Sequence, residues 1–231
     1  MNVQMRIGGF VLLMIFGFAP FSGWAQTAPS STEVAKYTGL HAAAYAGDIR
    51  EVTRLIASGA GLEARDTKDR TPLHVAAYQS HDGVVSALVA AGADINAYEY
   101  ADYDVVTIAA VADDLAMMKL ALSLGGNAKN ITSPYEGTAL IAAAHLGHVA
   151  VVDTLIKAGA PLDHVNNLDW TALIEAVVLG DGGPRHTEIV RLLIAAGADM
   201  SIADRQGVTP LAHAKRRGFD DMAATFPASA K

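Results

Sequence analysis

Residues 71–97 read TPLHVAAYQSHDGVVSALVAAGADINA, and this stretch predicts two short helices joined by a polar turn. Thr71 is placed to act as a helix N-cap, and Pro72 follows at the first helical position, where no N–H group is needed. The apolar residues of 84–91 recur at i, i+3 and i+4, which is the spacing of one helical face. Gly92 then favours a left-handed C-cap that ends the second helix.

The same pattern returns along the chain with a period near 33 residues. The Thr-x-Leu element recurs in five copies, and a sixth, degenerate element stands third in order and reads Asp104-Val105-Val106. A period of this length indicates stacked structural units, each burying its apolar face against its neighbours. The glycine that ends the second helix recurs as Gly59, Gly92, Gly125, Gly159 and Gly197.

This pattern resembles the ankyrin repeat over about residues 34–226. The resemblance implies an all-α solenoid of helix-turn-helix units with extended finger loops, in about six repeats. It also implies that His41 and His74 are structural, because the family's histidine at this place bonds within the turn and between repeats. We expect repeats at 35–67 (N-terminal cap), 68–100, 101–134 (degenerate), 135–167, 168–205 (with a loop insertion at 180–186) and 206–227 (C-terminal cap).

The first 25 residues predict a cleaved secretory signal. Arg6 precedes an almost wholly apolar run at 7–19, and Gly23-Trp24-Ala25 offers the small residues that a signal peptidase reads. The apolar run is too short to span a membrane. We expect cleavage after Ala25, a flexible lead-in at 26–34, and a periplasmic or secreted mature protein with no membrane segment.

Composition and charge exclude several classes of function. Lys and Arg number 17 against 24 Asp and Glu, which gives a net charge of −7. A chain of this charge without a basic run is a poor nucleic-acid binder, because it would approach a backbone of its own sign. Cysteine is absent, which excludes disulfides, thiolate metal sites and a catalytic thiol.

No arrangement of residues predicts catalysis. His145 and His148 are three apart but lack a third ligand nearby. His81, His164, His186 and His213 likewise have no set of partners that would form a metal site. Adjacent acids such as Asp113-Asp114 send their side chains in different directions, and no phosphate-binding loop is present. We therefore expect no enzymatic activity, no metal and no cofactor.

The concave face of such an array is the expected binding surface for a protein partner. Four fingers repeat an acid at one position, in Asp69, Asp102, Glu136 and Asp169. Aromatic side chains flanked by acids favour a basic partner, since the rings give contact area and the acids steer approach. The predicted partner-binding residues are Tyr45, Tyr78, Tyr100, Asp102, Tyr103, Tyr135, His145 and Trp170.

Two functions remain open at this point. The first is a monomeric, non-catalytic interaction scaffold in the periplasm that binds an exported protein. The second is an inhibitor or immunity protein against a toxin or hydrolase in the same compartment. The fold alone does not name the partner. The irregular third unit and the 180–186 insertion fit either neutral drift or a partner-specific feature.

Overall fold

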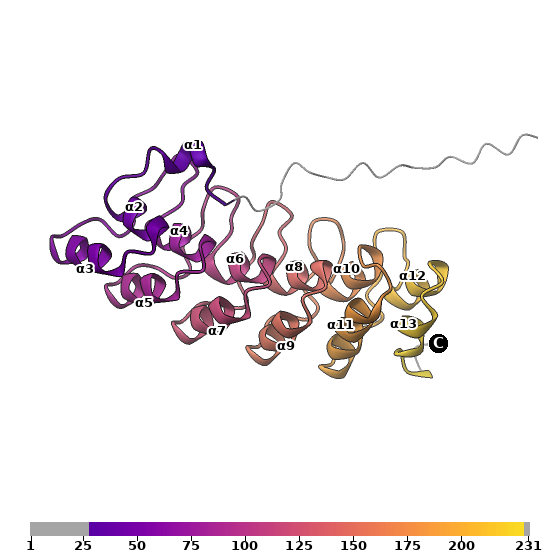
Figure 1. Cartoon of the computed structure of the whole chain (residues 1–231). Helices are drawn as coiled ribbons and strands as arrows, with labels where there is room; N and C mark the ends of the chain where they lie inside the picture. The colour runs from indigo at the N-terminus through magenta and orange to yellow at the C-terminus, as the bar shows by residue number, and fades with distance from the viewer. Residues whose placement is uncertain (1–27, 229–231) are drawn as a thin grey trace, which may run out of the picture.

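The computed structural model describes residues 28–228, whose helices stack in two parallel rows (Figure 1). Each helix contacts the next one in its own row, and the described residues contain no β-strand beyond one isolated bridge. The inner row consists of α2 (Gly39–Ala46), α4 (Pro72–Tyr78), α6 (Val105–Val111), α8 (Ala139–Leu146), α10 (Ala172–Val178) and α12 (Pro210–Arg216). The outer row consists of α3 (Ile49–Ala57), α5 (Asp82–Ala90), α7 (Leu115–Ser123), α9 (Val149–Lys157), α11 (Pro184–Ala195) and α13 (Asp220–Ala224).

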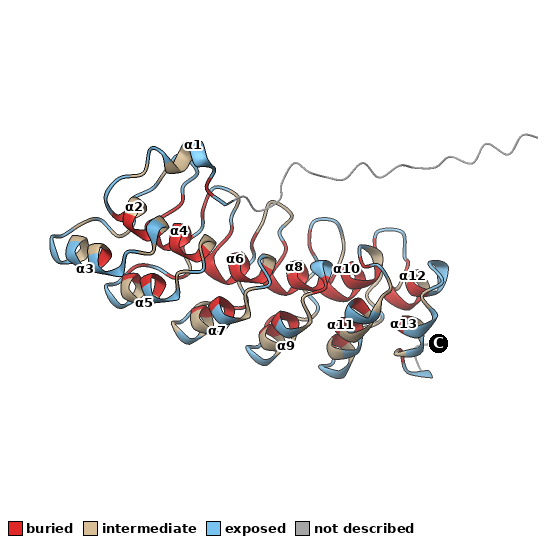
Figure 2. Cartoon of the chain, viewed as in Figure 1, coloured by how far each residue is buried: buried red, intermediate tan, exposed pale blue. Residues whose placement is uncertain are grey.

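This arrangement confirms the predicted all-α solenoid. The predicted signal segment, 1–25, lies outside the described residues. Within residues 28–228, no helix is long and apolar enough to cross a membrane. Figure 2 shows that the inner helices are buried on most of their surface, whereas the outer helices and the finger loops expose one side.

Four of the five threonines of the Thr-x-Leu element cap their helices, and Thr38 makes no such hydrogen bond. The Thr71 hydroxyl accepts a hydrogen bond from the His74 main-chain N–H, and Thr138, Thr171 and Thr209 cap their helices in the same way. The glycines that follow the outer helices adopt left-handed φ angles between 78° and 105°, which a side chain would disfavour. These local signals mark where four inner helices begin and where five outer helices end.

The degenerate third unit has the same architecture with different capping chemistry. Asp104 replaces the capping threonine, and its Oδ1 accepts the Thr107 main-chain N–H at 2.8 Å. Its other oxygen, Oδ2, accepts a hydrogen bond from Asn130 Nδ2 at 2.8 Å. The Asp104 side chain is buried, and that burial raises its pKa. Aspartate therefore serves as the N-cap where the repeat loses its Thr-x-Leu element.

Imidazole groups tie most neighbouring units together along the inner row. His81 Nε2 donates to the Tyr45 carbonyl at 3.1 Å, and His186 Nε2 donates to the His145 carbonyl at 3.0 Å. His148 uses Nδ1 instead, and donates to the Ala110 carbonyl at 2.9 Å. We call these bonds, which reach back to the preceding inner helix, latches.

The latches of His81 and His186 lie against a glycine that follows the preceding inner helix. A Cβ added at Gly47 would lie 2.8 Å from the His81 ring, and one at Gly147 would lie 3.1 Å from the His186 ring. In the second unit, Ser80 occupies the position of Gly47. In the third unit, Asp114 occupies the position of His81, so that unit has no imidazole there. Asp114 instead caps α7 by accepting the Met117 N–H at 2.9 Å. Among the described residues, no side chain of that turn reaches back to α4.

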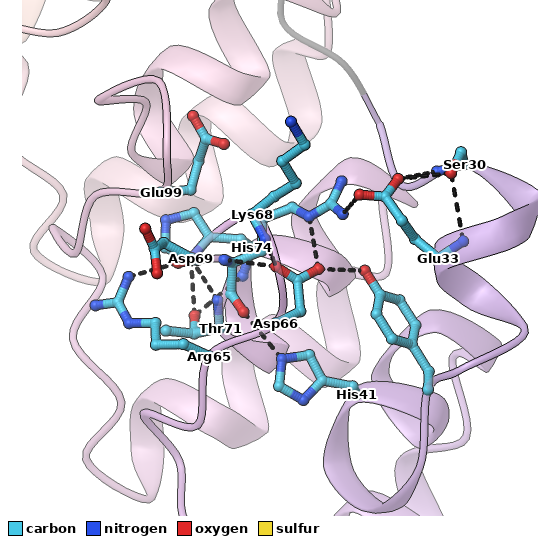
Figure 3. A network of polar contacts seen from close by, with 12 residues as sticks. Ser30, Glu33, His41, Arg65, Asp66, Lys68, Asp69, Thr71, His74 and Glu99 are labelled. Carbon is cyan, nitrogen blue, oxygen red and sulfur yellow. Dashed lines mark hydrogen bonds and ion pairs between the residues drawn. The ribbon is translucent and has the colours of Figure 1, made fainter.

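The segment 26–34, expected to be a flexible lead-in, is ordered where the structure describes it. Ser30 and Glu33 form a capping box that begins α1 (Ser31–Val34). Arg70 is 1% exposed, and its guanidinium joins Glu33 at 2.6 Å and Asp66 at 2.8 Å; Figure 3 labels these two acids. A buried guanidinium needs such paired carboxylates, so α1 is held against the first finger.

Candidate functional site

Five finger loops precede the inner helices α4 to α12 and project away from the outer row (Figure 1). A side chain closes most of them by accepting two main-chain N–H groups, as local turns of this kind require. Asp66 Oδ1 accepts from Lys68 and Arg70 at 2.7 and 3.0 Å. Asn166 Oδ1 accepts from Leu168 and Trp170, both at 3.0 Å. The fingers are therefore ordered by their own sequence.

Backbone hydrogen bonds join successive fingers into one surface. The Tyr100 N–H donates to the Lys68 carbonyl at 3.0 Å, and the Ser133 N–H donates to the Asp102 carbonyl at 3.2 Å. The Asn167 N–H donates to the Tyr135 carbonyl of the preceding finger at 3.0 Å. Side chains at equivalent places in successive fingers are thereby brought into rows.

One of these rows is acidic, and it occupies the left-handed position of each turn. Asp69, Asp102, Glu136 and Asp169 have φ angles between 52° and 62°, where the last finger has Gly207 at 71°. Aspartate tolerates this conformation better than most residues, and glutamate less well. The four acids thus share one backbone geometry as well as one place in the repeat.

A second set of side chains on the fingers is apolar and exposed. Tyr98 is 40% exposed, Ile131 54% and Val165 43%, and these three residues occupy one repeat position. Tyr100 and Leu168 add two more exposed groups near the finger tips. We define the finger surface as the exposed set Tyr98, Tyr100, Ile131, Val165 and Leu168.

Five of the eight large apolar side chains that are exposed in residues 28–228 lie on the fingers. Leu146, the last residue of α8, and Leu179, which follows α10, are also exposed. In the described part of the chain, only Ile49 of the outer row is comparably large, apolar and exposed. Such clustering marks an interaction surface, whereas scattered exposed apolar residues do not.

The residues predicted from sequence divide by exposure. Tyr100, Asp102 and His145 are exposed, whereas Tyr103 is only 6% exposed and packs in the core, so it cannot contact a partner without rearrangement. The remaining four are half-buried: Tyr45, Tyr78, Tyr135 and Trp170. Sequence reasoning missed Tyr98, Ile131 and Val165, although their spacing of 33 and 34 residues carried the signal.

Tyr78 is more a structural residue than an exposed contact. Its ring packs against the core, and its hydroxyl is buried without a hydrogen-bond partner among the described residues. Burial raises the pKa of this hydroxyl, so it stays protonated. Substitution of Tyr78 would therefore change stability together with any binding.

A buried carboxyl group lies on the inner row beside the fingers. Glu175 of α10 is 5% exposed, and burial raises its pKa to about 7. Its Oε1 accepts from Asn166 Nδ2 at 2.8 Å, and its Oε2 lies 3.5 Å from His145 Nδ1. Burial, with weaker contributions from two nearby histidines, lowers the pKa of His145. Asn166 and His145 are thus the polar neighbours of the Glu175 carboxyl group.

The remaining histidines bond to carbonyl and carboxylate groups within the fold. His41 Nε2 donates to the Arg70 carbonyl and His74 Nε2 to the Ala97 carbonyl, both at 2.9 Å, which confirms their predicted structural role. His164 donates to the Glu136 carbonyl, and His213 lies 2.7 Å from Asp204. Residues 28–228 contain no group of three potential ligands that could hold a metal ion.

Comparison with known proteins points to one family. The model described as ankyrin repeats (3 copies) matches residues 12–99 and 106–204. The ankyrin repeat protein YahD of Escherichia coli (strain K12) is 33% identical over 182 residues, covering 78% of this chain and 90% of that protein.

Solved structures of the same kind resemble the fold. An ankyrin repeat domain from Acinetobacter baumannii AYE is 39% identical with a TM-score of 0.77, covering 80% of this chain and 94% of that one. The ankyrin repeat protein EF0377 is 30% identical with a TM-score of 0.74, covering 82% and 97%. The ankyrin repeat domain of Bcl-3 is 26% identical with a TM-score of 0.72, covering 81% and 83%.

Proposed function

Because the chain belongs to the ankyrin-repeat family, we propose that it is a non-catalytic scaffold that binds an exported protein through the finger surface. Ankyrin repeats generally mediate protein–protein interaction, and members of the family are typically not enzymes. A binding site suits a surface whose side chains can vary without disturbing the core, and the finger loops form such a surface.

The observation that carries this proposal is the exposure of apolar side chains on the fingers. Tyr100 is 57% exposed and Ile131 54% exposed, and their ordered backbones hold them in place without a partner. A pre-ordered surface loses little conformational entropy on binding. Aromatic and aliphatic groups of this kind, rimmed by polar residues, supply much of the binding energy in protein interfaces.

We place the binding event in the periplasm, on the strength of the sequence of residues 1–25. Arg6, the apolar run and the small residues before Gln26 together predict export and cleavage. Cell fractionation with N-terminal sequencing tests this part on its own. We expect the mature chain to begin at Gln26 in the periplasmic fraction, and an uncleaved chain in the cytoplasm would contradict export.

The binding proposal is tested by isolating partners of the full chain, expressed in its host with a C-terminal affinity tag. We compare the wild type with a triple variant, Tyr100→Ser, Ile131→Ser and Leu168→Ser. The matched control is Ile49→Ser, which removes an equally exposed apolar group from the outer row. We expect one partner to be retained by wild type and control and lost by the triple variant.

Loss in the control as well, or retention by all three, would contradict binding at the finger surface. Thermal unfolding of each variant shows that the fold is intact. An inhibitor or immunity protein would use the same surface. It would be recognised by a partner that is an exported hydrolase or toxin whose activity falls on binding.

A further inference from the structure

The acidic row on the fingers is neutralised only in part by the chain itself. Asp169 Oδ2 forms an ion pair with Arg205 Nε of the next finger at 2.6 Å. Asp102 and Glu136, which stand at the same position in the two central fingers, have no cationic partner among the described residues. Between residues 98 and 104, and again between 131 and 138, the fingers contain no Lys or Arg.

The chain's own cations show what the surface accepts. Lys68 Nζ lies 4.6 Å from the centre of the exposed Tyr100 ring, which is a cation–π contact. Arg205 shows the second mode, a guanidinium set against a finger-tip carboxylate. Both cations reach across from a neighbouring finger. The carboxylates of Asp102 and Glu136 could accept a cation in the way that Asp169 accepts Arg205, and among the described residues none pairs with them.

Apolar groups accompany these acids. Ile131 begins the finger that carries Glu136, and Tyr98 and Tyr100 lie in the finger that carries Asp102. Burial of Asp102 and Glu136 under an apolar partner would leave their charges unpaired, which is costly. A partner that covers this surface must therefore supply positive charge as well as apolar contact.

We propose that the finger surface binds a protein segment in which Lys or Arg residues alternate with apolar ones. This inference rests on the proposed function and specifies the chemistry of the partner. Apolar side chains of the segment pack on Ile131 and Val165, while its cations pair with Asp102 and Glu136. A charge pair of this kind contributes mainly to the rate of association and to the choice of partner.

Two synthetic peptides of equal length serve as probes, one repeating Lys-Leu-Ser and the other Glu-Leu-Ser. Their binding to the full chain is measured by calorimetry at low and moderate salt. We expect the lysine peptide to bind, more weakly at moderate salt, and the glutamate peptide not to bind. A double variant, Asp102→Asn with Glu136→Gln, should lower the affinity for the lysine peptide about tenfold, the sum of two exposed charge pairs.

The control must separate this site from the overall negative charge. Asp153→Asn with Glu188→Gln removes the same charge from the outer helices α9 and α11, and should leave affinity nearly unchanged. Equal losses in both double variants, equal binding of both peptides, or no binding of the lysine peptide would overturn the inference. The proposed scaffold function would then still be decided separately, by whether the serine triple variant loses its natural partner.

Discussion

At the scale of single residues, a few buried polar side chains hold the units of the array together. Arg70 is the most demanding of them, because its guanidinium is almost wholly buried between Glu33 and Asp66. The Tyr37 hydroxyl also donates to Asp66 Oδ2, at 2.7 Å. This network orders the N-terminal end of the described residues.

Replacement of Arg70 tests that role. Arg70→Ala leaves two carboxylates facing each other in a partly buried place, and we expect it to lower the free energy of unfolding by about 3–5 kcal/mol. Arg191→Ala is the control, because its pair with Glu188 is exposed on the outer row and is worth less than about 1 kcal/mol. Urea unfolding of both variants measures the difference, and equal losses would contradict the assigned role.

Glu175 gives a prediction with a defined pH dependence. Its pKa of about 7 in the fold lies above the ordinary value of 4.5, so the folded state binds the proton more tightly. The stabilisation is complete below pH 4.5 and is lost as the pH rises through 7. Glu175→Gln should therefore stabilise the protein at pH 8 by about 3 kcal/mol and have little effect at pH 4.5. Thermal unfolding at both pH values checks this, and a gain that is equal at both would contradict it.

At the scale of elements, the latches and the glycines before them determine how neighbouring units stack. His81 and His186 each occupy space that a missing Cβ leaves open at Gly47 and Gly147. In the unit before His148, the place of these glycines is taken by Asp113, which has a side chain. His148 donates through Nδ1, not Nε2, and its acceptor is the Ala110 carbonyl. The position and ring nitrogen of each latch histidine thus depend on the residue that follows the preceding inner helix.

Substitution at two glycines separates this fit from backbone strain. Gly47 and Gly59 both have left-handed φ angles, 68° and 81°, but only Gly47 faces an imidazole. Gly59→Ala should cost about 1–2 kcal/mol from the backbone alone. Gly47→Ala should cost more, because it also displaces His81 from the Tyr45 carbonyl. Equal costs in denaturant unfolding would mean that the latch contributes nothing.

Much of the element structure was predictable because its causes are local. Thr71, Pro72 and Gly92 act through hydrogen bonds and backbone angles within their own unit, so the sequence reveals them. The latch of His81 reaches back 36 residues and the Glu33–Arg70 pair spans 37, and neither exists before the units stack. For the same reason, α1 was expected to be a flexible lead-in.

The candidate site was predictable in its location and only partly in its members. The repeat register places acids and aromatics on the fingers, and Tyr100 and Asp102 are exposed there as expected. Tyr103 is buried because it follows the left-handed Asp102 and turns back toward α6, where it packs in the core. The backbone conformation of this turn decides which finger side chains face solvent. The spacing of residues in the sequence does not predict that conformation.

At the scale of the whole molecule, the array has one junction that differs from the others. Among the described residues, the second and third units meet without a latch, beside the Tyr78 hydroxyl, which has no hydrogen-bond partner there. The last junction, by contrast, has Arg217, whose guanidinium donates to the Val178 and Gly180 carbonyls. Because each repeat contacts only its neighbours, stability varies along the array with the strength of its junctions.

This asymmetry predicts the order of unfolding. In moderate urea, amides of α2 to α5 should lose hydrogen-exchange protection separately from those of α8 to α12, with the boundary at α5 and α6. Native-state hydrogen exchange with mass spectrometry resolves these segments. A single cooperative loss of protection along the whole array would contradict a weak second junction.

The finger surface is where we propose that this protein binds its partner. The most direct measurement is site-specific photo-crosslinking in the host cell, with the photoreactive residue at Ile131 in one chain and at Ile49 in another. Both positions are exposed and apolar, at 54% and 46%, so the two chains differ chiefly in which row carries the probe. We predict a single protein adduct from position 131 and none from position 49. An adduct from position 49 alone would place the working surface on the outer helices and contradict the account.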